Sequence, residues 1–89
     1  QRKLDAERRK QLKPLYDALK KADRALEKYH AQQKALEEQL ADTTLYEDSN
    51  KEHLKQILQE KTKVDQALEE VEMDWMDISE QLETAESQE

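Results

Sequence analysis

The chain has 89 residues, of which 42% are charged and 35% hydrophobic, with one Pro, no Gly, no Cys and a formal net charge of −7. This composition indicates one elongated helical unit whose core is limited to a narrow seam, rather than a larger globular domain. The lack of Gly and Cys excludes a phosphate-cradling Gly-rich loop, disulfides and thiolate sites, and no apolar run approaches the ~18 residues of a membrane span.

The first predicted element is a helix over about residues 3–41. Seam positions recur every three then four residues, which is the period that keeps one helix edge facing a partner. They are Leu12, Leu15, Leu19, Ala22, Leu26, Tyr29, Gln33, Leu36 and Leu40. Pro14 removes a backbone donor and clashes with the preceding turn. We therefore expect it to interrupt this helix, with residues 1–13 kinked away or forming a separate segment.

The second predicted element is a connection over about residues 42–50, which has no apolar stripe. Thr44 and Glu47 match a weak capping box, so we expect a short helical turn that carries Leu45 and Tyr46. Ser49 followed by Glu52 is a stronger capping box and predicts the start of the next helix. Tyr46 at the tip is a candidate for an exposed aromatic contact, and Leu45 and Tyr46 together form a candidate tip contact.

The third predicted element is a helix over about residues 50–84. Its seam positions are Leu54, Ile57, Lys61, Val64, Leu68, Val71, Trp75, Ile78 and Leu82. Leu40 and Leu54 are two whole heptads apart, so periodicity alone also allows an uninterrupted rod that pairs with a second chain. The polar break, the capping boxes and the absence of attractive charge pairs in a parallel dimer favour a chain that folds back.

We therefore predict an all-α fold, an antiparallel two-helix coiled-coil hairpin that is monomeric in isolation. Facing residue numbers should sum to about 97, which sets the small Ala22 against the large Trp75 and makes Trp75 a core residue. Gln33 and Lys61 should form a polar notch in neighbouring layers, which most simply specifies the register and otherwise contacts a ligand or partner.

The two halves of the chain carry opposite charge. Residues 1–41 hold eleven Lys and Arg against seven Asp and Glu, whereas residues 42–89 hold four Lys against fifteen acids. The outward-facing positions hold Lys10, Lys13, Lys20, Lys21, Arg24, Lys28 and Lys34, and Arg2, Lys3, Arg8 and Arg9 extend this set toward the N-terminus. A phosphate backbone could lie along these side chains. The candidate nucleic-acid-binding residues are Arg8, Arg9, Lys10, Lys13, Lys20, Lys21, Arg24 and Lys28. A solubilising helix face is the alternative, since Asp17, Asp23 and Glu27 interrupt it.

Catalytic and metal chemistry is not indicated. His30 and His53 have no Cys or His at metal-ligand spacing, and the many carboxylate pairs lack a pocket that would desolvate them. We expect no catalytic residue, no metal site and no cofactor site in this segment, and the acidic residues 69–89 are read as a solvated face.

Several non-repetitive pieces resemble the C-terminal domain of ABC-F subfamily ATPases of the Uup and YheS type. They are Leu12-Lys-Pro-Leu15, Leu40-Ala-Asp-Thr-Thr-Leu-Tyr-Glu-Asp48, Glu70-Val-Glu-Met-Asp-Trp75 and Glu80-Gln-Leu-Glu83. Thr43 departs from the Pro that many relatives carry after the Asp. The chain starts without Met in a charged helical pattern, which also reads as a piece of a larger protein.

The resemblance implies a non-catalytic accessory arm of a cytoplasmic, two-cassette protein without a membrane domain. ATP and Mg²⁺ would belong to the cassettes elsewhere in the parent chain. The arm's partners would be DNA, ribosomal RNA or the ribosome, and the ATP-binding cassettes of its own chain. The alternative is a structural strut or protein-docking and ribosome-docking coiled coil that binds no nucleic acid of its own.

Overall fold

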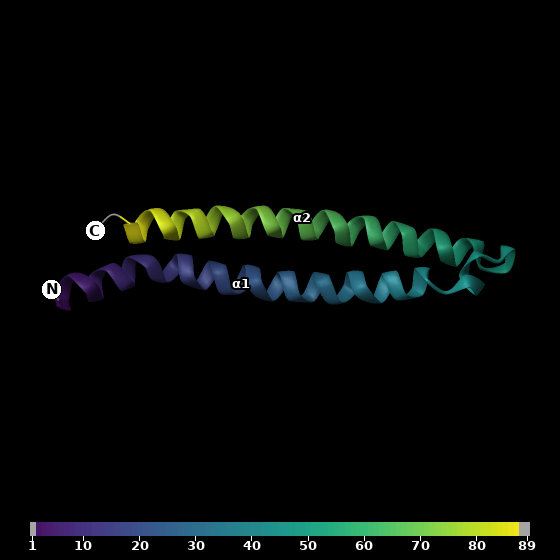
Figure 1. Cartoon of the computed structure of the whole chain (residues 1–89), viewed down its shortest axis with the longest axis horizontal. Helices are drawn as coiled ribbons and strands as arrows, with labels where there is room; N and C mark the ends of the chain where they lie inside the picture. Colours follow the sequence, from purple (N-terminus) through teal and green to yellow (C-terminus); the bar gives the residue numbers. More distant parts are fainter. Residues whose placement is uncertain (1, 88–89) are drawn as a thin grey trace.

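The chain folds into an antiparallel helical hairpin. The computed structural model describes residues 2–87, and their side chains from residue 6 onward. Helix α1 covers Arg2–Leu40 and helix α2 covers Lys51–Ser87, joined by two short 3-10 helices, η1 over Thr43–Tyr46 and η2 over Asp48–Asn50. The helices lie side by side with both chain ends at one end of the molecule, which measures 69 × 15 × 15 Å (Figure 1). The predicted hairpin is therefore confirmed over the uninterrupted rod.

Helix α1 runs without a break through Pro14, contrary to the expectation that this residue separates residues 1–13 from the rest. Proline removes one hydrogen bond to the carbonyl four residues earlier, which here belongs to Lys10. Both residues are exposed, so that carbonyl is not buried without a donor. The cost is therefore limited to one hydrogen bond and a local crowding of the turn, and the surrounding helix continues.

The connection is organised by Asp42 and Asn50. The expected helical turn with Leu45 and Tyr46 is present as η1, but Asp42 caps it: its Oδ1 accepts from the Thr44 amide at 3.0 Å and from the Thr44 hydroxyl at 2.8 Å. These bonds, the backbone one first, lower the pKa of the Asp42 carboxyl. The Asn50 amide Nδ2 donates to the Thr44 carbonyl at 2.8 Å. The turn is thus fixed by these two side chains rather than by the capping boxes predicted from Thr44 and Ser49.

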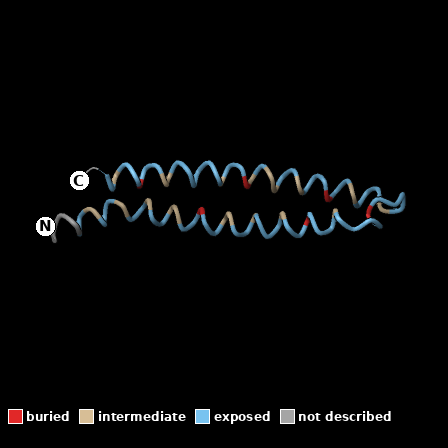
Figure 2. The backbone as a smooth tube through the Cα atoms, in the orientation of Figure 1, coloured by how far each residue is buried: buried red, intermediate tan, exposed pale blue. Residues whose placement is uncertain are grey.

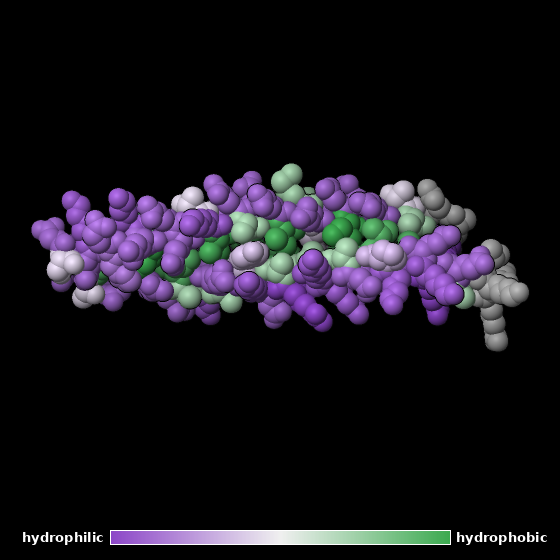
Figure 3. All heavy atoms as spheres, turned by 180° about the vertical axis from the view of Figure 1, so that it is seen from behind, coloured by the Kyte–Doolittle hydropathy of each residue, from purple (hydrophilic) through white to green (hydrophobic). Residues whose placement is uncertain are grey.

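The core is one row of side chains between the helices. In Figure 2 the buried positions of α1 and α2 face each other, and in Figure 3 hydrophobic atoms show along the middle of the rod between polar ones. The buried residues are Ala22, Leu36, Leu45, Ile57, Leu68 and Leu82. All but Leu45 are predicted seam positions, so the heptad pattern located the core of both helices.

Leu45 closes this core at the tip. It is 6% exposed and clusters with Leu36 and Ile57, with Leu40 and Leu54 packed against them. Its side chain is therefore covered by the ends of both helices and is not presented as a surface contact, which differs from the predicted tip pair. The η1 turn places it there because its backbone folds back over the seam.

The register agrees with the predicted one to within a residue. Gln33 bonds to Asp65 and Asp23 bonds to Trp75, and both pairs of residue numbers sum to 98. Trp75, however, is 37% exposed instead of being a core residue. Its indole Nε1 donates to the Asp23 carboxylate at 2.7 Å. A seam of only two helices leaves one side of each layer open, so the large ring lies at the flank where its polar N–H finds an acceptor.

Candidate nucleic-acid interface

Seven of the eight predicted nucleic-acid-binding residues form one exposed face of α1. At 3.6 residues per turn they fall within an arc of about 120° that is centred opposite the seam, and they extend over about 28 Å of helix. We call this set the basic stripe; it consists of Arg9, Lys10, Lys13, Lys20, Lys21, Arg24 and Lys28. The helical fold thus gathers on one surface cations that are spread over twenty residues of sequence.

The charges of the basic stripe are not neutralised within the hairpin. Among the described side chains the ion pair is Lys61 with Asp65 on α2, and no member of the stripe takes part in one. The Lys28 ammonium lies 5.7 Å from the centre of the Tyr29 ring, a contact that keeps its charge. Asp17 lies on the same face and is also exposed. Glu27, which is also exposed, lies at the edge of the same arc, in line with Arg9. The stripe therefore offers positive charge to solvent along its length, reduced locally by two carboxylates.

Arg8 lies apart from the stripe, although it was predicted as part of it. It is half-buried, and its guanidinium donates to the carbonyls of Ala85 at 3.0 Å and Glu86 at 3.4 Å. The last carbonyls of a helix have no partner within the helix, and α2 has no basic residue in its last turn. Arg8 supplies both a donor and a favourable charge at this helix end.

The heptad pattern contained the signal for this role. Counted back from Leu12, Arg8 takes a seam position, which faces the partner helix rather than solvent. Tyr16 contacts the same end of α2, where its hydroxyl donates to the Glu86 carboxylate. That hydrogen bond raises the pKa of Tyr16. Arg8 and Tyr16 therefore hold the open end of the hairpin together. The side chains of Arg2 and Lys3 lie outside the described residues.

The predicted polar notch is present and centres on Asp65, which the sequence reasoning missed. Its Oδ1 accepts from Gln33 Nε2 at 3.0 Å and its Oδ2 accepts from Lys61 Nζ at 2.9 Å. The Lys61 bond, followed by the Gln33 bond, lowers the pKa of Asp65, and the Asp65 bond raises the pKa of Lys61. Asp65 takes a heptad position that flanks the seam, and the predicted antiparallel register sets it beside Gln33. These two facts could have indicated its role from the sequence. The notch joins the helices internally and so fits register specification.

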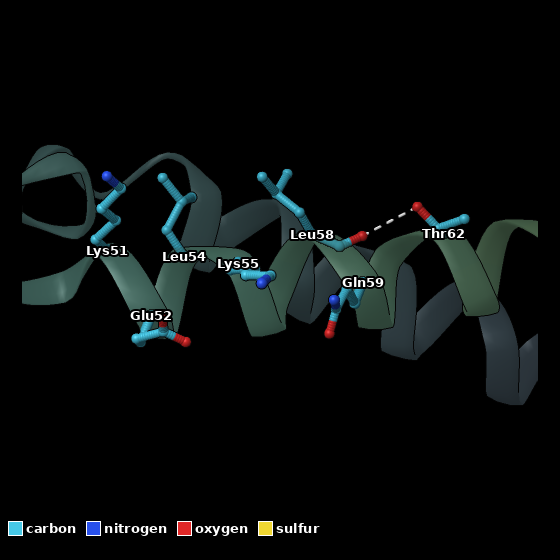
Figure 4. A pocket seen from close by; sticks show the side chains of 7 residues that line it. All are labelled: Lys51, Glu52, Leu54, Lys55, Leu58, Gln59 and Thr62. Atoms are coloured by element: carbon cyan, nitrogen blue, oxygen red, sulfur yellow. Dashed lines mark hydrogen bonds between the residues drawn. The ribbon is translucent and has the colours of Figure 1, made fainter.

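The tip presents one aromatic side chain. Tyr46 is 59% exposed, and its hydroxyl donates to the Leu40 carbonyl at 2.6 Å, which fixes the direction of the ring. On the neighbouring first turns of α2, Leu54 and Leu58 project from the helix beside Lys51 and Lys55 (Figure 4). Leu58 is 48% exposed. Of the predicted tip pair, Tyr46 alone is therefore available to a partner.

Other kinds of site are not found in the described part of the chain. Within residues 6–87 His30 and His53 are exposed, and no group of three or more His, Cys, Asp or Glu could hold a metal ion. No described helix has the length and apolar character needed to cross a membrane. Comparison of the chain with models of protein families, with curated proteins and with solved structures gave no match.

Proposed function

We propose that this hairpin is a non-catalytic arm that contacts the phosphate backbone of DNA or RNA through the basic stripe. The observation that carries the proposal is the clustering of seven unpaired cations on the face of α1 opposite the seam. Arg and Lys that neutralise phosphates release condensed counterions, which favours binding without reading base sequence. Residues 42–89, which include α2, carry fifteen acidic residues against four Lys, so the contact is limited to the α1 side of the rod.

The proposal also includes the wider context that the resemblance to ABC-F subfamily ATPases implies. The arm would then be an accessory domain that brings a cytoplasmic, two-cassette ATPase to ribosomal RNA or DNA. ATP and Mg²⁺ would be bound by the cassettes of the same parent chain. The basic stripe supports the nucleic-acid contact, while the family assignment is supported by the sequence pieces around the tip and around Trp75.

The experiment is a binding titration of the 89-residue chain with labelled duplex DNA and hairpin RNA, measured by fluorescence anisotropy. If about four cations contact phosphates, log K should fall with log salt with a slope of roughly −4 on duplex DNA. Lys20→Glu with Arg24→Glu should abolish binding. Lys51→Glu with Lys55→Glu is the matched control, since it makes the same charge change on exposed positions of α2.

The proposal fails if the chain does not bind at about 50 mM salt, or if the two double variants weaken binding equally. A variant that gains affinity provides a second test of whether the basic stripe is the binding surface. Asp17→Asn removes a carboxylate that lies within the stripe and should strengthen binding, whereas Asp48→Asn, which removes an exposed carboxylate at the tip, should have a smaller effect.

The second candidate function is a structural strut or docking arm. It is favoured by Tyr46, an exposed aromatic side chain held in place at the end of a 69 Å rod. In that case Tyr46→Ala should impair the intact parent protein while reversal of the charges at Lys20 and Arg24 has no effect. The opposite pattern would exclude the strut and support the nucleic-acid contact.

A further inference from the structure

Two methionines project from the face of α2 that is turned away from α1. Met73 is 62% exposed and Met76 is 59% exposed. They are three residues apart and therefore neighbours on the helix surface. In the heptad pattern both lie on the side opposite the seam, where polar residues are expected. Hairpin packing therefore does not account for two adjacent apolar side chains at this place.

Carboxylates surround the two methionines. Glu69, Glu70 and Asp77 lie one turn from Met73, and Glu80 lies one turn from Met76. All four are exposed, and within the described residues none of them forms an ion pair. We call the surface formed by these six residues the acidic methionine face. Its apolar centre and its negative rim are both unpartnered in the hairpin.

We propose that the acidic methionine face binds a Lys- and Arg-rich amphipathic helix of another protein. Methionine side chains are unbranched and polarisable, so they adapt to varied apolar side chains of a partner. The four carboxylates match a partner helix that carries its cations beside its apolar stripe. Phosphate groups would be repelled there, so this site is separate from the basic stripe and does not depend on the proposed nucleic-acid contact.

A second copy of the chain fits this face less well. The basic stripe is the region of the chain with the complementary charge, and it lies on the opposite side of the rod, outward from α1. A closed two-fold dimer needs the same surfaces of both copies to face each other. A rigid hairpin cannot turn both sides toward one partner at once, so copies could only stack in an open series. A different basic helix meets no such restriction.

The test uses the 89-residue chain and a synthetic peptide of Leu and Lys whose Leu residues share one face of a helix. Binding is measured by isothermal titration calorimetry, and a scrambled peptide of the same composition is the control ligand. Met73→Ser with Met76→Ser should weaken binding of the amphipathic peptide by about tenfold or more, because apolar area is no longer buried. Leu58→Ser, at another exposed apolar position of α2, should leave it unchanged.

Two further measurements separate this site from the alternatives. Glu70→Gln with Asp77→Asn should weaken binding and reduce its salt dependence, while Lys20→Glu with Arg24→Glu should not weaken it. Circular dichroism verifies that each variant keeps its helical content. Equal binding of the scrambled peptide, an unchanged affinity of the folded Met variant, or open self-assembly of the chain in sedimentation that excludes the peptide would each overturn the proposal.

Discussion

Replacing Leu45 by Ala tests whether the tip turn closes the core. Leu45 is 6% exposed and packs with Leu36 and Ile57, so the substitution removes buried apolar atoms and leaves a cavity between the ends of both helices. Buried Leu→Ala changes cost about 2–5 kcal/mol in unfolding free energy, depending on how far the site collapses. The tip is covered from one side only and can relax, so we expect about 2–3 kcal/mol.

This loss is large for a hairpin of this length. At roughly 0.05–0.15 kcal/mol per residue, the whole chain has a free energy of unfolding of the order of 4–13 kcal/mol. Urea unfolding followed by circular dichroism gives the difference directly. Leu58→Ala is the matched control: the same atoms are removed from a side chain that is 48% exposed, and the expected loss is below about 1 kcal/mol. Equal losses in the two variants would refute the assignment of Leu45 to the core.

Three other substitutions test the polar contacts. The folded pKa of Asp65 is lowered, so its stabilising effect is complete above the ordinary carboxyl range near pH 4 and is lost as pH falls through the folded pKa. Asp65→Asn should therefore reduce the acid-induced loss of stability, and a pH series of urea unfolding that superimposes on the parent chain would contradict this. Arg8→Gln should cost about 0.5–1 kcal/mol and speed amide hydrogen exchange in the last turn of α2, with little change at the tip. Trp75→Phe should cost only about 1 kcal/mol, because the indole is partly exposed and its main directed contact is the bond to Asp23; a loss typical of a buried Trp would restore the core assignment.

Features that depend on period and charge were predictable from the sequence. The spacing of seam residues located both helices, and Gln33 with Lys61 marked the polar notch. The register was predicted to within one residue, as the hydrogen bonds of Gln33 with Asp65 and of Asp23 with Trp75 show, but Trp75 does not fill a core layer against Ala22 as the size argument predicted. The exposure of the basic stripe follows from the same periodicity, since positions opposite a seam face solvent.

Features that depend on where a long side chain turns were not predictable in this way. A heptad position fixes the direction of Cβ, so the seam position of Arg8 indicates that it faces α2, but it does not indicate which atoms the guanidinium of Arg8 or the indole of Trp75 contacts. Each lies where a polar atom finds a partner, Asp23 in one case and the Ala85 carbonyl in the other. Leu45 lies outside the heptad pattern, and its burial follows from the fold of the η1 turn.

The position of the Leu36, Leu45 and Ile57 cluster beside the turn also has a kinetic consequence. Contacts at the tip close loops of about twenty residues, whereas the contact of Tyr16 with Glu86 spans 70 positions. Loop-closure entropy makes the distant contact costlier by about 1 kcal/mol if it forms first. Pairing of α1 with α2 should therefore begin at the tip and extend turn by turn toward the chain ends. Unfolding should take the reverse path and begin with separation of the helices at the chain ends. Arg9, Lys10 and Lys13 of the basic stripe lie in the half of α1 that closes last, so a ligand bound to them would slow the first step of unfolding.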